Sequence, residues 1–180
     1  MNDMKITQSL NASSEIKVRI AELIDLPSIV DIFNQAVPSH RSSATTTPVT
    51  VESRKAWFLE HKPDKHPIYL AEYAGRVIGW CSISMYRPGR NALRFTAELS
   101  CYVDQDYQNR GIGSFLISYA VRESPALGIK NLVGVVIDRN TASQKMLERL
   151  GFEKWGHLPR VLDFDGQECG EYYYGKRVSD

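Results

Sequence analysis

The chain has few cysteines, no excess of basic residues and no long apolar run, and each shortage excludes a class of protein. Its three cysteines, Cys81, Cys101 and Cys169, are too few and too scattered for a disulfide framework or a zinc site. Lysine and arginine together number 22 against 21 acidic residues, so there is no positive excess to neutralise nucleic-acid phosphates. We therefore expect no metal, no nucleic-acid partner and a reduced, cytoplasmic location.

The first residues, the apolar runs and the length of the chain predict its targeting, its relation to membranes and its number of domains. Residues 1–15 lack the apolar core of a secretory signal peptide, and we expect them to form a flexible tail. No apolar run approaches the roughly 20 residues that a transmembrane helix needs, so no membrane partner is expected. A length of 180 residues with 43% hydrophobic content suits one domain, which we place at 16–180.

Hydrophobic periodicity predicts a mixed α/β domain around one sheet, with the element order β-α-α-β-β-β-α-β-α-β-β. The expected strands are 16–21, 67–73, 76–86, 92–103 and 131–137, followed by one or two closing strands around a turn at Asp165-Gly166. The expected helices are 26–37, 51–61, 112–124 and 141–150. Asp25, Thr50 and either Asn140 or Thr141 are the expected N-caps, and Ala74-Gly75 is the expected turn of a hairpin.

A glycine-containing loop separates the strand ending at Val103 from the next helix. It is not a nucleotide P-loop, because no lysine follows its glycines, and it is not a dinucleotide fingerprint, because Leu116 stands where a third glycine is needed. Gly111 and Gly113 leave backbone N–H groups free at a helix start, and Arg110 adds a charge that can bind phosphate oxygens. The loop therefore suits a pyrophosphate, although a βα turn without a ligand is the alternative.

The strand before this loop carries a carboxylate among hydroxyl groups. Period-two alternation puts Glu98 on one face with Thr96, Ser100 and Tyr102, and puts Cys101 on the opposite, apolar face. A nucleophilic role for Cys101 is disfavoured, because no histidine is an obvious partner and because it faces away from Glu98.

Several motifs in order resemble the GNAT superfamily of N-acetyltransferases. Gln108-x-x-Gly111-x-Gly113, after Cys101-Tyr102-Val103, resembles its acetyl-CoA loop, and Asn140-x-x-Ser143-x-x-x-Leu147-x-x-x-Gly151-Phe152 resembles its next strand–helix unit. A narrower resemblance is to the phosphinothricin (methionine sulfoximine) N-acetyltransferases. It is carried by Asn34, Ser39, Thr46 with Pro48, Arg90-x-Ala92, Thr96-x-Glu98-x-Ser100-x-Tyr102-Val103 and Gly156-x-x-Pro159.

The resemblance implies a GNAT-like acyl-CoA N-acyltransferase fold, a mixed and mostly antiparallel sheet flanked by helices, with a strand–glycine loop–helix site for acetyl-CoA. It implies that the pantetheine arm pairs with the backbone of Cys101, Tyr102 and Val103. The pyrophosphate is then expected on Gln108, Asn109, Arg110, Gly111, Ile112, Gly113 and Ser114, with Asn140 and Ser143 also at the cofactor. A plain N-cap is the alternative role of Asn140.

The implied reaction is acetyl transfer to the amine of a small amino-acid-like acceptor by direct attack, with Glu98 as general base. Arg90, Asn91, Ala92 and Leu93 are the expected acceptor-binding residues, with the Arg90 guanidinium holding a carboxylate. Arg90 and Arg94 have the alternative of being solvated surface residues. Trp57, Tyr86, Phe95 and Tyr172 to Tyr174 are candidates for an acceptor pocket or, alternatively, for core packing.

Two other functions stay open, and one residue differs from the pattern of the resembling families. The enzyme can instead acetylate a protein N-terminus or lysine, or the chain can be a catalytically silent acetyl-CoA-binding module. Many superfamily members have a tyrosine as general acid at the position of Leu147, and the phosphinothricin group often has histidine. We expect Leu147 to pack in the core, which removes a dedicated acid from that position. A homodimer is also expected from the resemblance.

Overall fold

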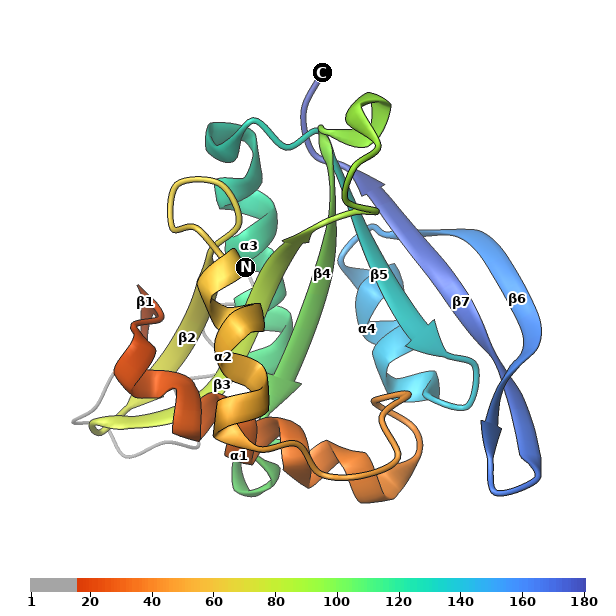
Figure 1. Cartoon of the computed structure of the whole chain (residues 1–180). Helices are drawn as coiled ribbons and strands as arrows, with labels where there is room; N and C mark the ends of the chain where they lie inside the picture. The colour runs from red at the N-terminus through yellow and green to blue at the C-terminus, as the bar shows by residue number, and fades with distance from the viewer. Residues whose placement is uncertain (1–15) are drawn as a thin grey trace.

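A computed structural model describes residues 16–180, so the expected tail at 1–15 lies outside the described residues. One seven-stranded sheet has the order β1-β2-β3-β4-β5-β7-β6 (Figure 1). The strands are β1 (Lys17–Ile20), β2 (Ile68–Tyr73), β3 (Arg76–Met85), β4 (Thr96–Val103), β5 (Asn131–Ile137), β6 (Glu153–Phe164) and β7 (Gln167–Arg177). The helices are α1 (Leu26–Ala36), α2 (Val51–Glu60), α3 (Ile112–Glu123) and α4 (Thr141–Arg149). The predicted element order is confirmed.

The sheet is mixed and mostly antiparallel, as expected. The pairing of β4 with β5 is parallel, and the other pairs of neighbouring strands are antiparallel. No helix within residues 16–180 has the length and apolar character needed to span a membrane.

Helices cover both faces of the sheet, and each face has its own apolar cluster. On one face, α3 and α4 contribute Leu116 and Leu147 to a cluster with Ile83 and Leu99. On the other face, Phe33 of α1 packs with Trp80 and Leu70, and Trp57 of α2 packs against them. Because side chains alternate along a strand, β3 and β4 send neighbouring residues into opposite clusters.

The turns and two of the helix N-caps lie where the local sequence predicts them. Ala74 and Gly75 both have positive φ, and so do Asp165 and Gly166, as the tight turn of a right-twisted hairpin requires. Thr50 accepts a hydrogen bond from the Ser53 N–H at 3.2 Å, and Asn140 accepts one from the Ser143 N–H at 3.1 Å. Of the two alternatives at the start of α4, Asn140 is therefore the cap.

One local prediction is wrong, and another is confirmed only in part. The strand expected at 92–103 begins at Thr96, because Asn91–Leu93 form a 3₁₀ turn in which the Leu93 N–H donates to the Arg90 carbonyl at 2.9 Å. Polar–apolar alternation continues through this turn and so could not reveal it. Asp25 occupies the N-cap position of α1, as predicted, but its side chain makes no capping hydrogen bond to α1; its carboxylate accepts instead from the backbone N–H of Glu22 at 2.8 Å.

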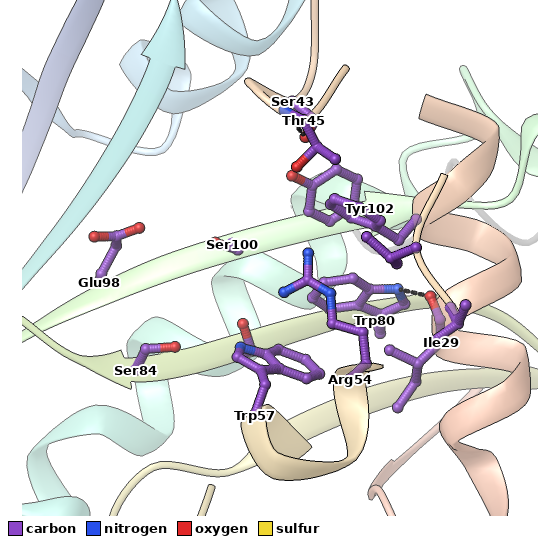
Figure 2. Close-up of a pocket in the computed structure, with 14 residues that line it drawn as sticks. Ile29, Ser43, Thr45, Arg54, Trp57, Trp80, Ser84, Glu98, Ser100 and Tyr102 are labelled. Atoms are coloured by element: carbon purple, nitrogen blue, oxygen red, sulfur yellow. Dashed lines mark hydrogen bonds between the residues drawn. The ribbon is translucent and has the colours of Figure 1, made fainter. Parts of the chain in front are cut away.

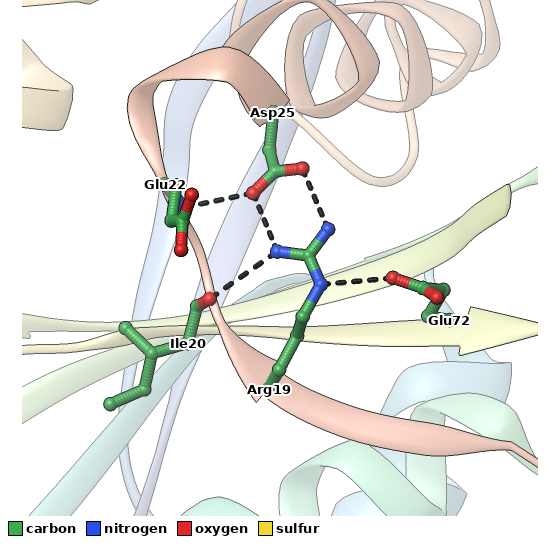
Figure 3. A network of polar contacts seen from close by, with 5 residues as sticks. All are labelled: Arg19, Ile20, Glu22, Asp25 and Glu72. Atoms are coloured by element: carbon green, nitrogen blue, oxygen red, sulfur yellow. Dashed lines mark hydrogen bonds and ion pairs between the residues drawn. The ribbon is translucent and has the colours of Figure 1, made fainter. Parts of the chain in front are cut away.

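Asp25 belongs to a charged network that joins three elements (Figure 3). Arg19 of β1 donates to both carboxylate oxygens of Asp25, at 2.7 and 2.8 Å, and to Glu72 of β2 at 2.9 Å. The hydrogen bonds from Arg19 lower the pKa of the Asp25 carboxyl, against the opposing effect of burial. The network therefore fixes the start of α1 to the edge of the sheet.

We predict that Asp25→Asn lowers the free energy of unfolding near neutral pH by about 1.5–3 kcal/mol, the usual range for hydrogen bonds to charged groups. Because the folded pKa of Asp25 is depressed, its contribution is present above the ordinary value of 3.8 and is lost as pH falls through the lowered value. Urea unfolding across this pH range should show the difference shrinking in acid. The exposed control Asp31→Asn should change little, and a pH-independent difference for Asp25→Asn would contradict the account.

Candidate active site

The site begins where β4 and β5 separate. The parallel ladder pairs Thr96 with Asn131, Ala97 with Leu132 and Glu98 with Val133, and it goes no further. In Figure 1 the two strands diverge from this point towards their carboxyl ends. The β5-facing backbone edge of β4 beyond Glu98 thus has no ladder partner among residues 16–180. An extended ligand segment can pair with such an edge as an added strand does.

The glycine loop lies at the end of this free edge. Gly111 is the N-cap of α3 with φ of 83°, and no side chain caps the helix. The first N–H groups of α3 are therefore available to an anion, and the helix dipole favours negative charge there. Arg110 is exposed, with its guanidinium carbon 5.3 Å from the centre of the Tyr107 ring. Gln108 donates its side-chain N–H to the Val103 carbonyl at 3.3 Å, which links the loop to the end of β4.

Gly113 has a packing role beside any binding role. A Cβ atom there would lie 3.3 Å from the Met146 sulfur and 3.7 Å from the Val103 Cγ2 atom. The missing side chain lets the first turn of α3 approach both α4 and β4 closely. A substitution at this glycine would therefore disturb packing even without a ligand.

A cavity of about 240 Å³ opens on the α1/α2 face of the sheet (Figure 2). Its walls come from α1, the loop after it, α2, β3 and β4. The aromatic residues of the lining are Phe33, Trp57, Trp80 and Tyr102. The other hydroxyl-bearing residues, beside Tyr102, are Ser43, Thr45, Ser82, Ser84 and Ser100, and the aliphatic residues are Ile29, Val30 and Val49. The two charged side chains in the lining are Arg54 and Glu98.

Glu98 lies at the junction of the cavity and the β4–β5 opening. It is half-buried and opposite Ser84 in the β3–β4 register, and no side chain in 16–180 donates a hydrogen bond to it. Burial raises the pKa of the Glu98 carboxyl, and the negative charge of Glu171 raises it further. A carboxylate with these properties can accept a proton from a ligand in the cavity.

Cys101 lies on the other face, as alternation predicts. It packs against the cluster under α3 and α4, and its Sγ atom is 3.9 Å from the Gly113 carbonyl oxygen. Cys101 therefore contacts the glycine loop from beneath the sheet and does not line the cavity.

The loop between α1 and α2 is held in place by residues from distant elements. Asn34 of α1 donates to the Val49 carbonyl and accepts from the Val49 N–H, each at 2.9 Å. The Tyr102 hydroxyl donates to the Ser42 carbonyl at 3.1 Å, and the Asn140 amide donates to the Ser42 hydroxyl at 3.3 Å. Asn140 is thus an N-cap that also contacts the cavity-lining loop.

Some residues expected to bind the acceptor are not part of the cavity lining. Arg90, Asn91 and Ala92 are exposed, Leu93 is half-buried, and none of the four lines the cavity. Of the aromatic residues proposed for an acceptor pocket, Trp57 lines it, whereas Tyr86, Phe95 and Tyr172 to Tyr174 do not. Tyr174 is fully buried and donates to Glu148 at 2.9 Å.

Sequence reasoning missed Arg54, Phe33 and Trp80 as cavity residues. Helical spacing within 51–61 and alternation within 76–86 show which residues share a face, but they do not show that two faces from distant segments meet. Leu147 is 3% exposed and lies in the core cluster, so its predicted packing role is confirmed.

The fold is that of a known class of enzyme. Residues 27–152 match the model of the Acetyltransferase (GNAT) family, and the chain belongs to this family. That membership confirms the predicted N-acetyltransferase and the predicted fold.

Relatives resemble the chain over most of its length. The L-methionine sulfoximine/L-methionine sulfone acetyltransferase of Pseudomonas aeruginosa is 35% identical over 86% of this chain and 88% of its own. The phosphinothricin N-acetyltransferase of Streptomyces viridochromogenes is 30% identical, covering 79% and 77%. A solved GNAT superfamily phosphinothricin acetyltransferase from Sinorhizobium meliloti, in complex with AcCoA, is 26% identical with a TM-score of 0.84, covering 90% and 88%.

We predict that Leu147→Ala lowers the free energy of unfolding by about 2–5 kcal/mol, because it leaves a cavity in the core beside Gly134. Denaturant unfolding measures this loss. The matched control is Leu59→Ala in α2, where the side chain is 51% exposed and little change is expected. Similar effects of the two substitutions would show that Leu147 does not act through packing.

Proposed function

We propose that the protein transfers the acetyl group of acetyl-CoA to the amine of a small amino-acid-like acceptor, with Glu98 as general base. The observation that carries this proposal is the position of Glu98, which lines the cavity and ends the β4–β5 ladder. The named activities of the relatives, on methionine sulfoximine, methionine sulfone and phosphinothricin, support an acceptor of this size and type.

The features around β4 fit acetyl-CoA, which supplies the acetyl group as an activated thioester. The free backbone edge at Cys101, Tyr102 and Val103 suits the amide groups of a pantetheine arm. The uncapped start of α3 suits the pyrophosphate. The proposed anion-binding residues are Gln108, Asn109, Arg110, Gly111, Ile112, Gly113 and Ser114, with Asn140 and Ser143 on the facing helix. Together they lead an extended ligand along β4 towards Glu98.

The chemistry needs a base at Glu98. An alkylammonium has a pKa of about 10, so an amine acceptor is protonated near neutral pH and cannot attack a thioester. Burial raises the pKa of Glu98 and so makes its carboxylate a stronger base than an exposed one. The proton on the amine therefore passes to Glu98, directly or through a water molecule. A thiol has a pKa of about 8.5, which makes it a good leaving group even though Leu147 offers no proton.

The size of the cavity favours a small acceptor over a protein. A volume of about 240 Å³ lies just below the range for small-molecule sites, about 300–1,000 Å³. Glu98, at the cavity wall, argues against a silent binding module. The acceptor contacts of Arg90, Asn91, Ala92 and Leu93, the homodimer, the cytoplasmic location and the single domain at 16–180 stay predictions.

Glu98→Gln should lower turnover by roughly 10²–10⁴, the usual effect of removing a general base, while the Kd of acetyl-CoA changes little. Thiol release from acetyl-CoA in the presence of an amine acceptor measures the first quantity, and calorimetric titration the second. The exposed control Glu153→Gln should keep both values. Wild-type turnover in Glu98→Gln would show that Glu98 is not the general base.

Arg110→Ala should weaken acetyl-CoA binding roughly tenfold through the loss of a charged contact to phosphate oxygens. S-acetylpantetheine lacks the pyrophosphate, so its affinity should be the same for wild type and variant. The control is Arg149→Ala, an exposed arginine on α4. Equal weakening of both compounds by Arg110→Ala would mean that Arg110 supports the loop and does not bind the pyrophosphate.

A further inference from the structure

Two opposite charges line the cavity from different walls. Glu98 comes from β4 of the sheet, and Arg54 comes from α2, which packs on the same face of the sheet (Figure 2). The rest of the lining is aromatic, aliphatic or hydroxylic. A ligand that fills this space therefore meets one acidic and one basic group.

Aromatic rings hold the Arg54 side chain. Its guanidinium carbon lies 4.8 Å from the centre of the Phe33 ring and 5.6 Å from that of the Trp57 ring. Such stacking stabilises the cation and leaves the N–H donors at the guanidinium rim free. In Figure 2 the guanidinium points from α2 towards β3 and β4, into the space beside Tyr102.

Arg54 has no anionic partner within residues 16–180, whereas other arginines do. Arg19 and Arg76 are paired with carboxylates at 2.7 to 2.9 Å, but no hydrogen bond or ion pair in the described part of the chain involves the Arg54 guanidinium. The positive charge of Arg54 acts on Tyr102, where it opposes the effect of burial, which raises the pKa of that phenol to about 12. The charge is thus directed into the cavity.

We propose that Arg54 binds an anionic pair of oxygens on the acceptor, a carboxylate or a phosphinate, while the amine of the acceptor faces Glu98. This inference rests on the proposed function, which it deepens by naming the group that selects the acceptor. A guanidinium matches two oxygens with two parallel N–H donors. An amine that lacks the anion leaves this cation unpaired in a half-buried cavity, so the enzyme should discriminate against it.

The test combines two substitutions with three acceptors. Arg54→Gln removes the charge, Arg54→Lys keeps the charge without the planar pair of donors, and Arg149→Gln is the exposed control. The acceptors are phosphinothricin, its decarboxylated amine, which keeps the phosphinate, and norleucine, which keeps the carboxylate. Steady-state KM and kcat are measured for each pair, and calorimetry with coenzyme A present measures acceptor binding without turnover.

For phosphinothricin, Arg54→Gln should raise KM and the acceptor Kd roughly 10- to 100-fold, with a smaller rise for Arg54→Lys and none for Arg149→Gln. If Arg54 binds the carboxylate, the rise persists for norleucine and disappears for the decarboxylated amine; if it binds the phosphinate, the reverse holds.

Two results would overturn the inference and leave the proposed function standing. One is an equal rise in KM for all three acceptors in Arg54→Gln, and the other is no rise in KM in this variant when its Tm matches that of wild type. If wild type acetylates peptide amines but none of the three acceptors, the proposed function fails, and this inference fails with it.

Discussion

The separation of β4 from β5 is the constraint on which the site depends. Two parallel strands share a ladder over three residue pairs and then diverge, so that β4 keeps one antiparallel neighbour, β3, and exposes the opposite edge. A buried edge without partners is costly unless another hydrogen-bonding group can reach it. The fold therefore leaves a strand position open to an extended ligand, and the uncapped start of α3 lies at the end of that position.

The two faces of β4 have different tasks because its side chains alternate. Ala97, Leu99 and Cys101 face the cluster under α3 and α4, which holds the glycine loop against the sheet. Glu98 and Tyr102 face the α1/α2 side, where the cavity lies. The same strand thus contacts the glycine loop with one face and presents Glu98, a carboxyl group whose pKa is raised by burial, on the other. The α1–α2 loop lines one side of the cavity and contacts both Tyr102 and Asn140.

Much of this arrangement follows from local sequence signals, and the parts that do not have physical reasons. Element order, the turns at Ala74-Gly75 and Asp165-Gly166, and the caps Thr50 and Asn140 depend on a few neighbouring residues, so the sequence predicts them. Arg54 lines the cavity because α2 packs on the same face of the sheet as α1, close to β4. The hydrophobic spacing within α2 does not show which part of the sheet the helix will contact. The Asp25 carboxylate does not cap α1 because it is paired with Arg19, a residue of β1 whose approach no local pattern reveals.

The central claim is that Glu98 accepts the proton of the amine, and the pH dependence of kcat/KM tests it most directly. A base with a raised pKa is inactive while protonated, so activity in wild type should rise as pH increases through the pKa of Glu98 and then level off. In Glu98→Gln this rise should vanish, leaving a much lower activity that increases only as the free amine deprotonates, at a pKa of about 10. Superimposable profiles for the two proteins would contradict the account.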